Sequence, residues 1–213
     1  QQYIPIAKMR SLTLPDGTKV QLNSKSTLLY PHEFTGDSRS VFLLGEANFK
    51  VKPDKKRPFI VKSNDLQITA LGTEFNVSAY PESQEIATTL ISGSIRVAYN
   101  NLTTSVILHP NEQFAYNRNN KKYDLSNPDM DDVTAWQRGE LVLQKMTLTD
   151  IINVLERKYP YAFVYSIKNL KNDRFSFRFK DNAPLEEVME IIVNVVGQMD
   201  YRIVEDKCYL TRI

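Results

Sequence analysis

The fold of this chain is decided by the stretch Leu66-Gln67-Ile68-Thr69-Ala70-Leu71-Gly72-Thr73-Glu74-Phe75-Asn76-Val77-Ser78-Ala79-Tyr80. On both sides of Gly72, apolar residues alternate with polar ones. Alternation with a period of two is typical of strands that bury one face. Glycine tolerates the backbone angles of a sharp bend. The stretch therefore predicts two half-buried strands joined at Gly72.

Four further segments repeat this pattern around a turn residue. These residues are Gly17, Gly45, Gly93 and Asn111, each flanked by alternating apolar residues. Gly17 follows a proline and an aspartate, which favour a tight turn, so we expect a hairpin there. The uneven spacing of the units excludes a strict repeat array. We expect a mainly β domain, either a β-roll or short β-solenoid or a sandwich, and the periodicity leaves both open.

Composition changes between Asn117 and Val133. Asparagine, proline and aspartate replace most apolar residues there, which is typical of a loop or linker. We therefore expect two domains, a β-rich domain at 1–130 and a small domain at 131–213.

The second domain shows helical periodicity in two segments. Thr147 precedes the first segment as a candidate N-cap, and Pro160 ends it. Pro184 suits the first turn of the second helix, and Gly197 suits its end. With the short strands around them, the predicted order is β-α-β-β-α-β-β, an α+β fold with two helices. The apolar stripes of the two helices are Leu148, Ile151, Ile152, Leu155 and Tyr159, and Leu185, Val188, Ile192, Val195 and Val196.

Composition and charge restrict the class of function. The chain has 213 residues, 42% hydrophobic and 24% charged, with a formal net charge of +2. These values are typical of a soluble globular protein and lack the basic excess of a nucleic-acid binder. No apolar run is long enough to span a membrane. Cys208 is the single cysteine, which excludes an internal disulfide, and we expect it in the core.

Residues with catalytic or metal-binding side chains form no recognisable motif. His32 and His109 each border a proline at a predicted strand end, where a turn or surface role is expected. Asp129, Asp131 and Asp132 lack the glycine and the distal glutamate of a calcium loop, so they indicate a solvated linker. We therefore expect a binding protein rather than an enzyme, with no cofactor and no metal.

Several motifs in order carry a resemblance to a known family. They are Leu14-Pro15-Asp16-Gly17-Thr18, Gly45-Glu46-Ala47-Asn48-Phe49-Lys50-Val51, Arg57-Pro58-Phe59-Ile60-Val61, Leu71-Gly72-Thr73-Glu74-Phe75-Asn76-Val77, Thr89-Leu90-Ile91-Ser92-Gly93-Ser94-Ile95, Leu108-His109-Pro110-Asn111-Glu112-Gln113, and Trp136 before Gly139. This pattern resembles the periplasmic region of the FecR-like anti-sigma factors, the ferric-citrate-regulator type. Residues 139–213 are similar to the C-terminal domain of its Bacteroidetes-type members and to the short N-terminal fold of secretins and TonB-dependent receptors. Lys50 and Asn111 depart from the usual acidic residue and glycine.

The resemblance implies the soluble, periplasmic part of a single-pass inner-membrane regulator. Because the chain starts at Gln1, we expect the sigma-factor-binding cytoplasmic segment and the membrane span to precede it. The implied partner is the N-terminal signalling domain of a TonB-dependent outer-membrane transporter. Docking of that domain would relay a signal that frees the sigma factor after regulated proteolysis.

Open strand edges in the second domain are the expected docking surface, because an added partner strand supplies main-chain hydrogen bonds. The candidate edge residues are Arg174, Phe175, Ser176, Phe177, Arg178, Phe179, Tyr201, Ile203, Tyr209 and Thr211. The three phenylalanines alternate along their strand, and we expect that stripe to face the core. The competing hypothesis is a carbohydrate- or peptide-binding β-rich module of a secreted or surface protein, which predicts an exposed aromatic cluster in the first domain.

Overall fold

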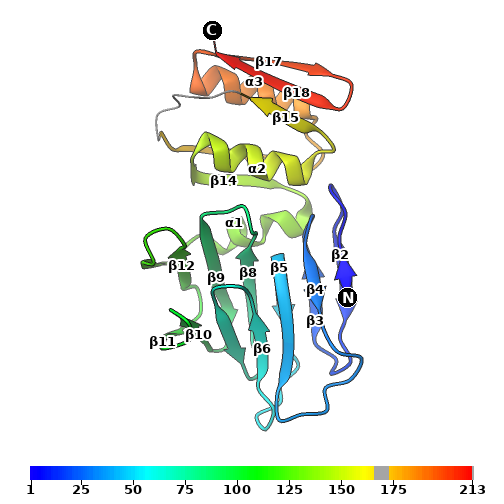
Figure 1. Cartoon of the computed structure of the whole chain (residues 1–213), viewed down its shortest axis with the longest axis vertical. Coiled ribbons are helices and arrows are strands. Elements are labelled where there is room, and N and C mark those ends of the chain that lie inside the picture. Colours follow the sequence, from blue (N-terminus) through cyan, green and yellow to red (C-terminus); the bar gives the residue numbers. More distant parts are fainter. Residues whose placement is uncertain (166–172, 213) are drawn as a thin grey trace. The chain divides into compact units, whose positions relative to one another are not determined.

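The computed structural model describes residues 1–165 and 173–212. The chain divides into two units, Gln1–Thr134 and Ala135–Ile213, each with its own hydrophobic core (Figure 1). The division follows helix α1 (Met130–Thr134), whereas the sequence analysis placed it at residue 130. Among the described residues, no helix combines the length and apolar character that a membrane span needs.

The first unit is a single curled sheet of 13 strands, which confirms the prediction of a mainly β fold. The central path of the sheet is β11-β10-β7-β6-β5-β8-β9-β12-β13, and the remaining strands attach to β5 through β3 and β4. The strands are β1 (Gln2–Tyr3), β2 (Arg10–Thr13), β3 (Lys19–Leu22), β4 (Thr27–Leu29), β5 (Arg39–Lys50), β6 (Phe59–Lys62), β7 (Gln67–Ala70), β8 (Glu74–Ala79), β9 (Glu85–Ser92), β10 (Ile95–Tyr99), β11 (Thr104–Leu108), β12 (Gln113–Asn117) and β13 (Tyr123–Ser126).

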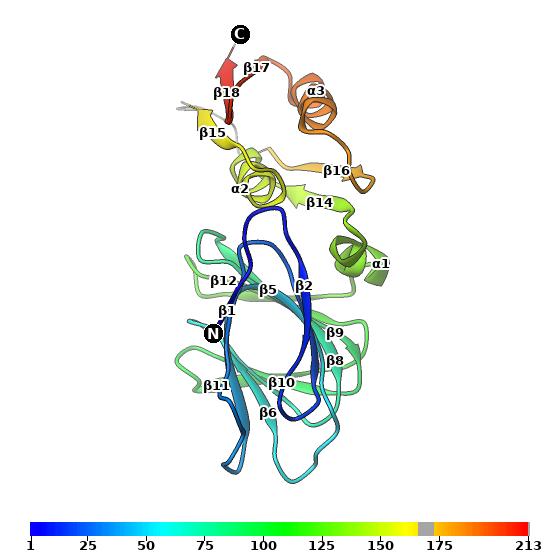
Figure 2. The same ribbon diagram turned by 90° about the vertical axis from the view of Figure 1, so that its right-hand side faces the viewer.

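Strand β5 is shared by two layers of this sheet. Its first half, residues 39–44, pairs with β4 and β6, and its second half, residues 45–50, pairs with β3 and β8. The first layer therefore holds β1, β4, β6, β7, β10 and β11, and the second layer holds β2, β3, β8, β9, β12 and β13. Figure 2 shows the two layers facing each other in the first unit.

The predicted turn residues have two different roles. Gly17 lies in the β2–β3 hairpin, as expected. The strands flanking Gly72 are present, but β7 and β8 do not pair, because the chain crosses there from one layer to the other. Gly93 and Asn111 mark the next two crossings. Gly45 was wrongly expected to separate two strands: β5 runs through it and changes layer at that residue.

Position 45 requires glycine, because the backbone just before β4 passes close to it. The φ of Gly45 is +102°, a value that residues with a side chain rarely adopt. A Cβ atom at this position would lie 2.7 Å from the Cα of Ser26. The absent side chain thus lets the bent strand pass against that backbone.

Aromatic rings fill the space between the two layers. Phe49 of the second layer packs against Phe59 of the first, with ring centroids 5.9 Å apart, and stacks on Phe75 at 5.4 Å. Further along, Tyr99 of the first layer meets Phe114 of the second at 5.3 Å. The alternating residues on each strand therefore meet in one shared core.

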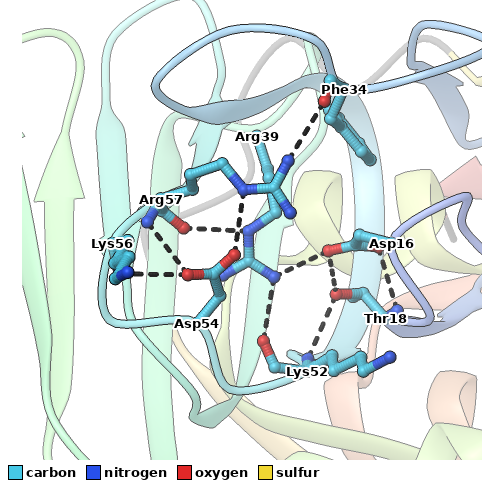
Figure 3. Close-up of polar contacts among 8 residues, drawn as sticks. All are labelled: Asp16, Thr18, Phe34, Arg39, Lys52, Asp54, Lys56 and Arg57. Carbon is cyan, nitrogen blue, oxygen red and sulfur yellow. Dashed lines mark hydrogen bonds and ion pairs between the residues drawn. The ribbon is translucent and has the colours of Figure 1, made fainter.

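A buried ion pair ties the β2–β3 hairpin to β5. The Nη1 of Arg39 donates to Asp16 Oδ2 at 2.7 Å, and the two side chains are 1% and 4% exposed (Figure 3). The same guanidinium donates to the carbonyl oxygens of Lys52 and Arg57, at 2.8 and 2.9 Å. Asp16 also accepts hydrogen bonds from the backbone N–H and the hydroxyl of Thr18. Asp16 and Thr18, which belong to the first family motif, therefore have a structural role.

The second unit has the predicted order β-α-β-β-α-β-β. After a short 3-10 helix, η1 (Ala135–Arg138), its elements are β14 (Leu141–Met146), α2 (Leu148–Lys158), β15 (Ala162–Tyr165), β16 (Phe175–Phe179), α3 (Leu185–Val196), β17 (Met199–Val204) and β18 (Lys207–Arg212). Strands β14 and β16 form one antiparallel sheet, and β15, β18 and β17 form a second sheet in that order. Residues of both helices and both sheets share one core.

The helix boundaries follow the predicted capping signals. The hydroxyl of Thr147 accepts from the backbone N–H of Asp150 at the start of α2. Helix α3 ends before Gly197, whose φ is +69°. The predicted stripe of α3 is wrong at Val195, which is 58% exposed, whereas Met189 is buried. Val196 of the last turn still packs partly against the core, so the buried face of α3 runs through Met189 and Val196 and leaves Val195 outside.

Candidate partner-binding surface

Strand β16 presents the first group of predicted site residues. Phe177 and Phe179 are buried and Phe175 is partly buried against the same core, so the phenylalanine stripe is core, as predicted. On the opposite face, Arg178 Nη2 lies 2.8 Å from Glu140 Oε2. The hydroxyl of Ser176 accepts from the backbone N–H of Lys145.

These polar side chains hold β16 to its neighbour β14. Arg174 adds a hydrogen bond from Nη1 to the carbonyl oxygen of Lys145 at 2.7 Å. Hydrogen bonds from Arg138 and then Arg178 lower the pKa of Glu140, so this carboxylate stays charged. The side chains of Arg174, Ser176 and Arg178 are thus already engaged within the unit.

Strand β18 is not an edge, so the prediction for Tyr209 was wrong. Tyr209 lies opposite Arg202 of β17 on one side and opposite Val164 of β15 on the other. Thr211 pairs with Asp200 of β17 on the same central strand. The sequence shows the terminal hairpin, but β15 joins it in parallel from a distant position, which no local pattern indicates.

Strand β17 is an edge among the described residues. Val204 and Lys207 flank a two-residue turn and form the pair that closes the hairpin. Antiparallel pairs alternate between bonded and non-bonded, so the backbone N–H groups of Ile203 and Tyr201 point away from β18. In agreement, the N–H of Tyr201 donates to the side chain of Asp200, 2.8 Å away.

The outer face of this three-stranded sheet carries a cross-strand row that sequence reasoning missed. Val164, Tyr209 and Arg202 lie side by side on the three strands. The guanidinium carbon of Arg202 lies 5.5 Å from the centre of the Tyr209 ring. Val164 and Val204 are 43% and 42% exposed. The alternation in β15 and β17 predicts one outward face on each strand. The row forms only because both strands pair with β18, which the sequence does not indicate.

The inner face of the same sheet carries two titratable side chains whose pKa values are raised. Cys208 is buried, and burial raises the pKa of its thiol to about 11, so it packs as a small apolar group, as predicted. Burial, together with Glu190 and Glu186, raises the pKa of Tyr201. The Tyr201 hydroxyl donates to the carbonyl oxygen of Glu186 at 3.0 Å. These groups stay protonated at neutral pH.

The histidines of the first unit lie apart from any candidate catalytic or metal-binding group of the described residues. His32 and His109 are both exposed and lie in turns, as predicted. Among the residues that the structure describes, no group of histidine, cysteine, aspartate and glutamate side chains is placed to hold a metal ion. An aromatic cluster around Tyr99 and Phe114 is buried, except that Tyr123 at its margin is 43% exposed.

Comparisons with known proteins cover nearly the whole chain. Residues 5–96 match the family described as FecR protein, and residues 140–210 match the family described as FecR, C-terminal. Two crystal structures of a candidate anti-sigma factor from Parabacteroides distasonis ATCC 8503 are each 33% identical to the chain, with a TM-score of 0.92. Each alignment covers 100% of this chain and 98% of the crystallised one. No curated protein matches the chain.

The two family matches follow the two structural units in order, and the similarity to the crystallised protein extends through both. Such identity along the full length shows common family membership, which confirms the expectation from the motifs. The chain belongs to the FecR-like anti-sigma factors, a family of signalling proteins.

Proposed function

We propose that this chain is the periplasmic sensor part of a transmembrane anti-sigma factor. In this proposal it docks the signalling domain of a TonB-dependent outer-membrane transporter and relays the docking to a sigma factor. Family membership supports the signalling role. The open edge and outer face of the β15–β18–β17 sheet support a docking role for the second unit.

The edge of β17 is the observation that carries the docking proposal. The outward N–H of Ile203 suits the addition of a partner strand, and the N–H of Tyr201 would exchange its bond to the Asp200 side chain for one to the partner. Asp200 and Arg202 are charged and exposed on the same strand, which limits unspecific pairing of the open edge. Exposed Val204 adds an apolar contact beside it. Strand β16 pairs with β14 alone among the described residues, so it is also an edge, as predicted. It is the weaker candidate, because its polar side chains already bind β14 and are less available to a partner.

The test is a calorimetric titration of the full chain with the signalling domain of the transporter encoded beside it. We expect saturable one-to-one binding. Ile203→Pro removes an outward N–H and leaves the hydrogen bonds to β18 in place, so it should weaken binding about tenfold or more. Val204→Glu should also weaken binding, because it places a charge in the apolar part of the same surface.

The matched control is Leu125→Pro on β13, an edge strand of the first unit. By the same alternation, the N–H of Leu125 points away from β12, so the backbone change is equivalent. Leu125→Pro should bind like the unchanged chain, and circular dichroism checks that all variants fold. Unchanged affinity in both Ile203→Pro and Val204→Glu would exclude the β17 edge. Weaker binding in Leu125→Pro alone would move the docking site to the first unit.

The relay is tested in the full-length regulator with a reporter gene that depends on its sigma factor. Ile203→Pro should abolish induction by the transporter's nutrient while leaving the amount of regulator unchanged. Normal induction would contradict a role of this edge in signalling.

A further inference from the structure

A cavity in the first unit has no role in the proposed docking. Three hairpin loops gather around it: residues 63–66 between β6 and β7, residues 100–103 between β10 and β11, and residues 118–122 between β12 and β13. Its volume is about 490 Å³. Small-molecule sites typically measure roughly 300–1,000 Å³. The cavity therefore has the size of a small-ligand site.

Arg118 links two of these loops, 63–66 and 118–122, to the turn between β8 and β9. Its Nη1 donates to the carbonyl oxygens of Tyr80, Pro81 and Ser83, at 2.7, 3.0 and 2.7 Å. Its Nε forms an ion pair with Asp65 at 3.0 Å, and Asp65 lines the cavity. One guanidinium thus joins the 63–66 loop, its own loop and the turn between β8 and β9, so two of the three cavity loops are linked to each other without a ligand.

The cavity walls contain four residues other than glycine with positive φ. Asn100, Asn101 and Leu102 follow one another at +49°, +54° and +65°, and Lys121 lies at +59° on the opposite loop. Asparagine tolerates this conformation, whereas for leucine and lysine it costs about 1–2 kcal/mol each. Backbone strain of this kind concentrates at ligand-binding and other functional sites. Its presence on two facing loops favours a binding role.

The charge around the cavity is positive. Lys62 and Lys121 both line it, and Lys121 Nζ lies 6.0 Å from the centre of the Tyr116 ring. Within the described part of the chain, neither lysine pairs with a carboxylate. Asp65 is the one acidic residue of the lining, and Arg118 already neutralises it. The lining also carries four side-chain amides, those of Asn64, Gln67, Asn100 and Asn101.

We propose that this cavity binds a small, carboxylated and polyhydroxylated molecule of the acidic-sugar class. Lys62 and Lys121 would pair with the carboxylate, because charge-assisted hydrogen bonds are the strongest that these loops can offer. The amides both donate and accept, so they suit neighbouring hydroxyl groups of a sugar ring. The site is separate from the β17 edge and does not depend on the docking proposal.

The test follows the backbone amide signals of the ¹⁵N-labelled full chain by NMR during titration with glucuronate, glucose or sodium acetate. Glucuronate should shift the amide signals of Asn64, Asn101 and Lys121 in a saturable way. Glucose, which lacks the carboxylate, and acetate, which lacks the hydroxyl groups, should each bind at least about tenfold more weakly.

The double variant Lys62→Gln/Lys121→Gln should weaken glucuronate binding about tenfold or more. The control Lys55→Gln/Lys56→Gln removes the same charge from an exposed loop before β6 that does not line the cavity, and it should bind glucuronate normally. Absence of saturable shifts at the cavity, equal binding of glucose or of acetate, or equal loss in both double variants would each overturn the proposal.

Discussion

Replacing Arg39 by methionine removes the guanidinium from the buried ion pair and leaves an apolar side chain of similar length. Asp16 then loses its cationic partner, and the carbonyl oxygens of Lys52 and Arg57 lose a donor. Breaking a buried pair at one end costs about 3–5 kcal/mol. Because Thr18 still donates twice to Asp16, we expect the lower end of that range, about 3 kcal/mol.

The matched control is Arg57→Met, the same chemical change at an exposed pair. Arg57 Nε lies 2.9 Å from Asp54 Oδ2, a distance like that in the buried pair, but the Arg57 side chain is 44% exposed. Solvent screens such a pair, so its loss should lower the stability of the first unit much less than the loss of the buried pair. The two variants therefore separate burial from contact distance.

Urea unfolding followed by hydrogen exchange measures the two units separately. Peptides from β5 and β8 report on the first unit, and the fluorescence of Trp136, the single tryptophan, reports on the second. Arg39→Met should lower the urea midpoint of the first unit by about 1–2 M and leave the Trp136 transition unchanged. A shift no larger than that of Arg57→Met would refute the reasoning, because the buried pair would then add no net stability.

Three other changes have defined outcomes. Gly45→Ala should destabilise the first unit by about 1–3 kcal/mol, because of its positive φ and the nearby backbone, whereas Gly36→Ala has open space and should be neutral in urea unfolding. Because burial raises the pKa of the Cys208 thiol to about 11, the folded second unit keeps this thiol protonated, and its stability contribution is fully present below pH about 9 and lost as the pH rises to about 11. In Cys208→Ala, the free energy of unfolding measured with Trp136 should therefore fall less between these pH values. Thr147→Ala should cost about 1 kcal/mol in the same assay by removing the N-cap of α2, and no change would show that the cap is dispensable.

Features that depend on neighbours in the sequence could be predicted. The order of elements in the second unit, the N-cap at Thr147 and the end of α3 at Gly197 all follow from local backbone and capping preferences. The buried phenylalanine stripe of β16 followed from strict alternation. The sequence thus determines each element largely within a window of a few residues.

Features that depend on distant pairing could not be predicted. Alternation around Gly72 and Gly93 is the same whether the flanking strands pair with each other or enter different layers. The sequence therefore could not predict that the chain crosses between layers at these glycines. Asp16 indicated a turn, but its partner Arg39 lies at the start of β5, and strands β3 and β4 separate the two residues in the chain. The position of Tyr209 on a central strand depended on β15, whose parallel pairing has no local signature. The outer-face row and the loop-lined cavity are products of such pairings.

The sharing of β5 has a consequence for motion within the first unit. A slip of one residue along a strand would turn every side chain to the opposite face. Because residues 39–44 and 45–50 belong to one continuous strand, such a slip would have to occur in both layers at once. The pairings of the two layers are therefore coupled, because a shift of register in one layer alone would require a break in β5.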